Sequence, residues 1–445
     1  MKKYWLLIFV LGPLVWAQPV LTEREQARVK DELLGERLTQ LLPELMDRTG
    51  IDLWVMITRE YNEDPVVKTL LPATWLNARR RTMILFYRDA DTQTMDRLAV
   101  ARYAFGPHIA SAWDAEKQPD QWKRLVELIS ERNPKKIGIN VSEDFNIADG
   151  LDHTDYALLM DYLPEELRSK VVSAQPLATA WIETRTEREM QIYTQLSDLT
   201  HKIIAQAFSE QVITPGITTT TDVEWWFREE LTRLGLETWF HPSVDVQRTE
   251  DALGDHLYSF ANRPEHQVIQ HGDLLHCDFG ITYLGLNTDC QELAYVLRPG
   301  ETAPPNFLTQ ALAQGNQLQD FLTDEFKTGR TGNEILAQAL KNAKKSGLRP
   351  SIYTHPLGSY GHSSGPTIGM WDQQNGVPGA GDYPLFPRTV YAIELNTTVF
   401  IPQWKRDIRI MLEEPGYFGP EGFRYVHGRQ TQLLTIPRVQ EHQGY

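Results

Sequence analysis

Cysteine is scarce in this sequence: its 445 residues include only Cys277 and Cys290. Two cysteines cannot build the disulfide framework of a small secreted scaffold, so the fold has to rest on its hydrophobic core. Positive charge is also scarce, with 44 Lys and Arg against 59 Asp and Glu and a net charge of −15. Because the basic residues form no long run, this balance argues against nucleic acid or an anionic membrane surface as a partner.

Long apolar runs are missing after the first residues, and within residues 22–180 no Gly-rich turn leads from a strand into a helix to hold a phosphate. At the N-terminus, two lysines precede an apolar run that is broken by a Gly-Pro pair and closes at Ala17. This pattern predicts a signal peptide over residues 1–17, a mature chain from Gln18 in the periplasm or medium, and no membrane contact after cleavage. An uncleaved anchor is the alternative, but the run is shorter than the roughly 20 residues that span a bilayer.

Two domains are expected, because 445 residues exceed what one hydrophobic core usually serves. Residues 18–180 alternate helical stretches with short apolar strands at 53–57 and 82–87, which predicts a small α/β domain. Residues 181–445 form the second domain. Its first helix is predicted to begin at a Thr186–Glu189 capping box, and its second at a Thr221–Glu224 box, ending near Gly235. Two further helices are expected over residues 306–325 and 333–345.

Acidic residues stand in two apolar strands of the second domain. The segment LLHCDFGITYLGLNTDCQELAYVL predicts two strands joined by a turn around Gly285, with Asp278 on the first and Asp289 on the second. If these acids face each other across the hairpin, they can bridge a pair of metal ions. The same pairing makes Cys277 and Cys290 neighbours on the other face, as a cross-strand disulfide or as two buried thiols.

Two later strands, TVYAIELNTTVFI and DIRIMLEE, each point one glutamate away from their apolar face, Glu394 and Glu413. A Gly-rich loop before them, THPLGSYGHSSGPTIG, carries His355 and His362. Four carboxylates and one neutral imidazole sum to a charge that two divalent cations neutralise. Manganese, zinc or cobalt suits oxygen ligands with one imidazole. Such a pair lowers the pKa of water and stabilises a tetrahedral intermediate, which indicates amide hydrolysis.

In this order, the segments resemble the pita-bread metallopeptidases, which include methionine aminopeptidase, Xaa-Pro aminopeptidase, prolidase and the non-peptidase creatinase. The resemblance implies an α/β N-terminal domain plus an α+β pita-bread catalytic domain. It also implies a dinuclear hydrolase that acts on a peptide or a small amide. Its two divalent ions are expected to be manganese, and the chain is expected to form a homodimer. The implied metal ligands are Asp278 in HCDFG, Asp289 in NTDCQ, His362 in HSSG, Glu394 in AIELN and Glu413 in IMLEE. Glu394 or Glu413 would move the proton, and His355 would contact substrate.

The sequence departs from the family in motifs that handle substrate. The family's HGxGH loop appears as HPLGSYGH, and a His expected about seventeen residues before Asp278 is replaced, with Ala261 at that place. Met411 stands where Arg is common, and an alternative alignment puts Met411 at the position of Glu413. These departures leave open a creatinase-like C–N hydrolase or lyase that acts on a small metabolite, and a metal-free binding protein.

A serine hydrolase is the alternative from another class. Residues 361–365, GHSSG, match GxSxG with Ser363 as the nucleophile. That motif requires a strand before the serine and a helix after it, whereas Pro366 follows the motif at once.

Overall fold

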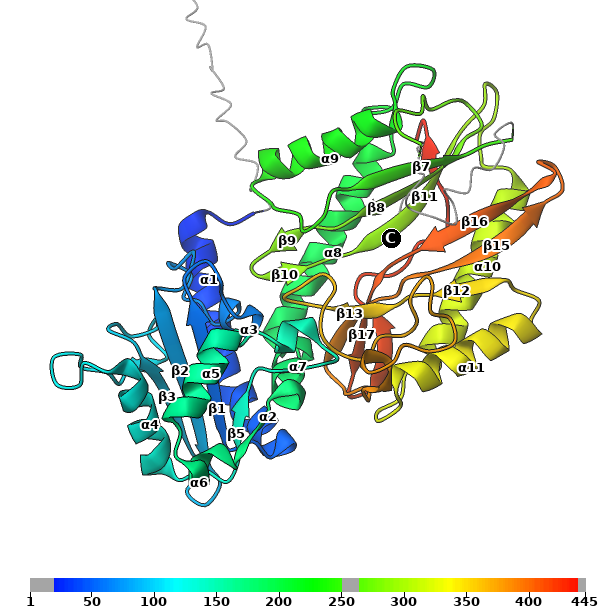
Figure 1. Ribbon diagram of the computed structural model, residues 1–445. Helices are drawn as coiled ribbons and strands as arrows, with labels where there is room; N and C mark the ends of the chain where they lie inside the picture. Colours follow the sequence, from blue (N-terminus) through cyan, green and yellow to red (C-terminus); the bar gives the residue numbers. More distant parts are fainter. Residues whose placement is uncertain (1–19, 250–263, 439–445) are drawn as a thin grey trace, which may run out of the picture.

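The computed structural model describes residues 20–249 and 264–438. The predicted signal peptide at 1–17 lies outside these ranges, as does Ala261, which stands where the family has a His. Both interpretations stay predictions from sequence. Within the described ranges, no helix combines the length and the apolar character needed to cross a membrane. Figure 1 shows two lobes, one coloured blue to teal and one green to red.

The first lobe is built on a six-stranded sheet in the order β4-β3-β2-β1-β5-β6. The strands predicted at 53–57 and 82–87 are β1 and β2. The strands are β1 (Leu53–Arg59), β2 (Arg81–Asp89), β3 (Thr94–Val100), β4 (Ala110–Ser111), β5 (Ile137–Ile139) and β6 (Val171–Ser173). The helices are α1 (Glu23–Glu36), η1 (Arg37–Leu41), α2 (Leu42–Thr49), α3 (Pro65–Lys68), α4 (Gln121–Arg132), η2 (Asn146–Ala148), α5 (His153–Tyr162), α6 (Glu165–Arg168) and α7 (Gln175–Glu183).

Alternation along β1 supplies two hydrophobic cores, one on each face of this sheet. Trp54 and Met56 join the core that contains Leu42 and Leu45 of α2, whereas Val55 joins the core with residues of α4. A two-sided core is what a sheet covered by helices on both faces requires.

Two helices lead into the second lobe, α8 (Glu187–Ala207) and α9 (Thr220–Leu234). The predicted box at α8 is confirmed: Glu189 N donates to Thr186 Oγ1 at 3.2 Å, and Thr186 N donates to Glu189 Oε2 at 2.7 Å. At α9 the prediction was wrong, because the box is Thr219 with Asp222. Four consecutive threonines, residues 218–221, span the start of this helix, and Asp222 accepts the cap N–H as well as Glu would.

Three larger sheets shape the described part of the second lobe, in the orders β19-β11-β8-β7, β12-β15-β16 and β13-β14-β17-β18, and β9 and β10 form a two-stranded sheet. Helices α8 and α9 pack on the first sheet, α10 (Asn306–Thr323) packs against β15 and β16, and α11 (Gly332–Lys345) packs against α10 and β12. The strands are β7 (Ser243–Gln247), β8 (Leu274–Phe279), β9 (Thr282–Tyr283), β10 (Leu286–Asn287), β11 (Cys290–Val296), β12 (Pro350–Ile352), β13 (His355–Leu357), β14 (Thr389–Ala392), β15 (Leu395–Ile401), β16 (Arg406–Leu412), β17 (Pro415–Gly419), β18 (Gly422–Tyr425) and β19 (Leu434–Ile436).

The two glutamate strands are each interrupted, where the sequence predicted them continuous. The first is split into β14 and β15 at Ile393 and Glu394, and the second into β16 and β17 at Glu413 and Glu414. Since β14 pairs with β17 in one sheet and β15 with β16 in another, the chain passes between sheets at both glutamates. The crossings lie side by side, because Ile393 N donates to Glu414 O at 2.9 Å.

The register of β8 and β11 differs from the one that places the two aspartates opposite each other. Asp278 pairs with Gln291, and Cys277 pairs with Glu292. The two cysteines are therefore offset along the strands, and both are buried free thiols. The predicted cross-strand pairing of Cys277 and Cys290 was wrong, because the short β9–β10 hairpin between the strands sets a register two residues away.

Candidate metal centre

Carboxylates from the three larger sheets of the second lobe meet at one place. Asp278 lies on β8, Asp289 directly before β11, and Glu394 and Glu413 at the two crossings between sheets. Ligand atoms of Asp289, His355 and Glu413 all lie within 4.8 Å of one another. The charges of Asp278 and Glu394 also act on Asp289. The structure thus brings together side chains more than 130 residues apart, since Asp278 and Glu413 come from opposite ends of this lobe.

His355 is the imidazole that reaches these acids. Its Nε2 lies 3.5 Å from Glu413 Oε1, 3.7 Å from Asp289 Oδ2 and 3.8 Å from Glu394 Oε2. Its Nδ1–H donates to the carbonyl of Pro356 at 3.0 Å, which fixes the tautomer and leaves the Nε2 lone pair toward the acids. Burial lowers the pKa of His355 to about 4, so the ring is neutral.

His362 lies beside this centre and faces solvent. Its ring centroid is 4.7 Å from that of His355 and 5.1 Å from that of Trp239, and the residue is exposed whereas His355 is buried. The sequence interpretation gave His362 to the metals and His355 to the substrate. Among the described residues, His355 is the histidine in ion-pair range of Asp289, Glu394 and Glu413.

Unsatisfied atoms show that these residues fit a cation. Asp289 Oδ1, Glu413 Oε1 and His355 Nε2 are buried without a hydrogen-bond partner. Burial, followed by the neighbouring acids, raises the pKa of Asp289 and Glu394 well above their usual range, and burial raises that of Glu413 to about 8. Buried acceptors gathered this closely are costly unless cations neutralise them. The donor set of carboxylates and one imidazole is that of a divalent metal site.

Gln291 connects the two glutamates and was not singled out from sequence. Its Nε2 donates to Glu394 Oε1 at 2.6 Å and to Glu413 Oε2 at 2.7 Å. Its Oε1 accepts from His276 Nε2 at 2.9 Å, and His276 Nδ1 lies 3.3 Å from Asp245 Oδ2. One sequence signal was available, since a Gln two residues after Asp289 in an apolar strand faces the same side as that acid.

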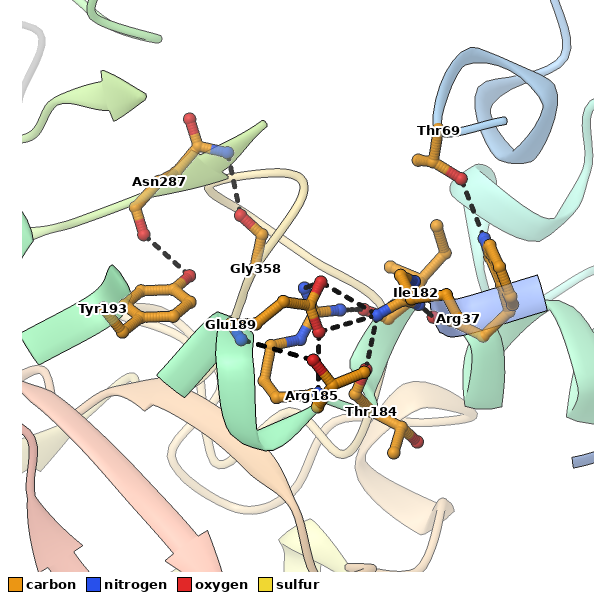
Figure 2. A network of polar contacts seen from close by, with 11 residues as sticks. Arg37, Thr69, Ile182, Thr184, Arg185, Glu189, Tyr193, Asn287 and Gly358 are labelled. Atoms are coloured by element: carbon orange, nitrogen blue, oxygen red, sulfur yellow. Dashed lines mark hydrogen bonds and ion pairs between the residues drawn. The ribbon is translucent and has the colours of Figure 1, made fainter. Parts of the chain in front are cut away.

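The loop that carries both histidines is held at its centre. Asn287 donates from N and from Nδ2 to Gly358 O, both at 2.9 Å, and Tyr193 OH donates to Asn287 O at 2.8 Å (Figure 2). Farther along, Tyr360 OH donates to Pro65 O at 2.7 Å, and Pro65 belongs to the first lobe. Both lobes therefore position the histidine loop.

A buried group of charges joins the lobes close to this loop. Arg37 Nη1 lies 3.0 Å from Glu189 Oε2, and Arg185 Nη1 lies 3.3 Å from Glu189 Oε1 (Figure 2). Arg37 also donates to Thr184 O at 2.9 Å and to the carbonyl of Trp181. Because Glu189 caps α8, this group links η1 of the first lobe to the first turn of α8.

Ser363, the alternative nucleophile, lies in irregular backbone. Residues 362–367 form bends rather than a helix, and Ser363 N donates to Pro356 O at 3.0 Å. The strand–serine–helix geometry of a nucleophile elbow is therefore missing at this position of the described chain.

Comparison with known proteins relates the second lobe to one family. The model of metallopeptidase family M24 matches residues 191–414. No curated protein sequence matches the chain.

Among solved structures, the X-Pro aminopeptidase from Thermotoga maritima MSB8 is similar with a TM-score of 0.61 and 15% identity, over 88% of this chain and 99% of that one. A putative aminopeptidase P from Bacillus anthracis is similar with a TM-score of 0.60 and 12% identity, over 88% of this chain and 95% of that one. The dipeptidase PepE from Mycobacterium ulcerans is similar with a TM-score of 0.58 and 15% identity, over 92% of this chain and 99% of that one. At these identities the likeness establishes the fold.

Proposed function

Because the chain belongs to metallopeptidase family M24, we propose that it is an aminopeptidase or dipeptidase that cleaves Xaa-Pro peptides with two divalent metal ions. The observation that carries the proposal is the buried cluster of Asp289, His355 and Glu413, in which one acceptor atom of each side chain lacks a hydrogen-bond partner. The similar structures that are named for Xaa-Pro substrates or as dipeptidases support the choice of substrate.

The ligand set that we propose is Asp278, Asp289, His355, Glu394 and Glu413. It exchanges the two histidine roles expected from the sequence. His355 is buried, neutral and within 4 Å of three of the acids, which suits a metal ligand. His362 is exposed beside Trp239, which suits a contact with the substrate. Manganese is the proposed metal, with zinc and cobalt as alternatives that suit the same donors.

Bound divalent ions would supply Lewis acidity toward the scissile carbonyl and lower the pKa of water. The protein's own part is to hold the ligands and to move a proton. Gln291 fixes one oxygen of Glu394 and one of Glu413. Glu394 is the more exposed of these two acids, at 15% against 1% for the side chain, so we assign the proton transfer to Glu394. Gly358, held by Asn287, keeps the histidine loop in place.

We further propose a periplasmic or secreted enzyme, from the pattern of residues 1–17, that acts as a homodimer on peptides. A net charge of −15 supports a partner other than nucleic acid. Size-exclusion chromatography with light scattering, and fractionation of the native host, test these two points.

Metal content and peptide cleavage test the central proposal. Protein purified without chelator is analysed by mass spectrometry for metal and assayed on Xaa-Pro dipeptides and tripeptides. The expected result is about two divalent ions per chain or more, with cleavage that a chelator abolishes and manganese restores. Serine-reactive phosphonates should leave the activity intact, and the reverse pattern would favour Ser363. Metal without Xaa-Pro cleavage would point to a creatinase-like reaction on another small amide, and a metal-free protein would refute a metallopeptidase.

A further inference from the structure

A second group of ligand-type side chains lies behind the metal centre, on the opposite face of the same strands. Along β11, Gln291 faces the metal centre while Cys290 and Glu292 face α8, because successive side chains alternate. Glu413 and Glu414 alternate in the same way. Glu413 accepts a hydrogen bond from Gln291 on the side of the metal centre, and Glu414 accepts one from His201 of α8 on the opposite side.

Three of these residues already have the spacing of a cation site. The ligand atoms of His201, Cys290 and Glu414 all lie within 4.8 Å of one another. His201 Nε2 is 2.7 Å from Glu414 Oε2 and 3.8 Å from Glu292 Oε1. All four side chains are buried, so solvent does not complete their interactions.

An ion pair with His201 alone does not explain the burial of Glu292. Its side chain is fully buried, and neither carboxylate oxygen has a hydrogen-bond partner. One imidazole, on His201, serves two carboxylates here, and it already bonds Glu414. A buried carboxylate in this position requires either a proton or a further positive charge.

We propose that His201, Cys290, Glu292 and Glu414 form a structural site for a thiophilic divalent cation of the zinc type. An imidazole, a thiolate and two carboxylates provide four protein ligands and leave no open position, which is typical of structural rather than catalytic zinc. With a dication the site carries the same net charge as a Cys₃His zinc site. It does not rest on the proposed function, since none of its side chains belongs to the carboxylate cluster in front.

The surroundings orient these ligands. His201 Nδ1 is 3.0 Å from His427 Nδ1, and His427 Nε2 is 3.5 Å from Asp198 Oδ1. Cation binding would displace the proton that His201 Nε2 shares with Glu414, and His201 Nδ1–H would then donate to His427, as the second nitrogen of a metal-bound histidine does. Gln430 N donates to Glu414 Oε1 at 2.9 Å, which leaves Oε2 directed at His201.

The site would join helix α8 to strand β11 and to the crossing between β16 and β17. His201 comes from α8, Cys290 and Glu292 from β11, and Glu414 from the crossing between β16 and β17. A cation here ties together segments more than 200 residues apart in sequence and braces the strands that carry Asp289 and Glu413.

Cobalt is the probe that separates this site from the metal centre, because the metal centre contains no sulfur ligand. The full chain, freed of metal and titrated with Co²⁺, is expected to develop thiolate-to-cobalt charge-transfer absorption in the near ultraviolet. Cys290→Ser should lose this absorption. Cys277→Ser is the matched control and should keep the absorption, since Cys277 is also a buried thiol and pairs with Glu292 across the strands but lies outside the cluster of His201, Cys290 and Glu414.

Two more variants keep the test decisive if Cys290→Ser does not fold. Glu292→Gln preserves shape and should weaken cobalt binding at least tenfold, and His427→Ala should weaken it about tenfold to a hundredfold while keeping the absorption. Wild-type protein that binds cobalt without charge-transfer absorption would overturn the proposal and leave a metal-free His201–Glu414 ion pair. Absorption that survives in folded Cys290→Ser would also overturn it.

Discussion

At the residue scale, burial gives the two histidines of one loop different chemistry. His355 is enclosed and its Nδ1–H is bonded to Pro356, so its Nε2 can only be an acceptor. His362 is exposed, with its ring against His355 and Trp239. The same residue type therefore suits a metal ligand at one position and a substrate contact at the other.

Replacing each histidine by alanine tests this division. His355→Ala is expected to weaken metal binding by at least tenfold to a hundredfold and to lose turnover with it. His362→Ala should keep the metal and raise KM or lower kcat. Calorimetric titration with manganese and steady-state kinetics measure both. Metal loss in His362→Ala together with retention in His355→Ala would restore the roles expected from the sequence.

Gln291 is predicted to support metal binding although it carries no charge. Gln291→Ala removes the donor that holds Glu394 and Glu413, so metal affinity should fall about tenfold to a hundredfold. Gln338→Ala on α11 is the control, because that Gln bonds only to Asn342 on its own helix among the described contacts. Equal affinities in the two variants would show that Gln291 does not orient the ligands.

At the element scale, the end of α7 places an acid where water does not reach. Glu183 is the last residue of α7, with Arg48 Nη2 3.5 Å and Tyr383 OH 3.3 Å from its Oε1. Its Oε2 has no hydrogen-bond partner. Burial raises the pKa of Glu183 to about 8, although Arg48 opposes this shift.

This acid predicts a pH dependence of stability. Because the folded-state pKa is above the unfolded value, the folded protein holds a proton that the unfolded chain releases, so its contribution is fully present below about pH 4.5 and is lost as pH rises toward about 8. Glu183→Gln should remove that loss, with a difference on the order of 3–5 kcal/mol across the window. Thermal unfolding of both proteins between these values measures it. Parallel curves would show that Glu183 does not titrate in this range.

At the scale of the whole molecule, the first lobe takes part in the site of the second. Tyr360 reaches Pro65, and Arg37 reaches Glu189 at the start of α8. The relative placement of the lobes therefore affects the loop that presents His355 and His362.

Arg37→Ala is expected to destabilise the protein by about 3–5 kcal/mol, because among the described residues it leaves the buried Glu189 with one ion-pair partner, Arg185. The neighbouring pair of Arg28 and Glu32 is exposed, so Arg28→Ala should cost about 0–1 kcal/mol and serves as the control. Denaturant unfolding measures the difference, and peptide cleavage shows whether the histidine loop moves. Equal losses in the two variants would show that the buried group does not join the lobes.

Local patterns in the sequence located several elements without the structure. The Thr186 capping box, the strands at 53–57 and 82–87, and the helices near 306–325 and 333–345 appear as predicted, because capping and periodicity act within a few residues. The resemblance to the pita-bread family is likewise confirmed. The domain boundary at 180 and 181, which falls inside α7, stays a prediction.

What the sequence by itself determined is the set of residues that face inward, since alternation along a strand is a local property. Only the tertiary structure decided how these residues combine: which histidine meets the acids, the register of β8 and β11, and the contact of Gln291 with Glu394. The histidine loop has no periodicity, and its position depends on bonds to Asn287 and to Pro65 in other parts of the chain. Contacts between residues this far apart depend on how the sheets pack, which no local pattern encodes.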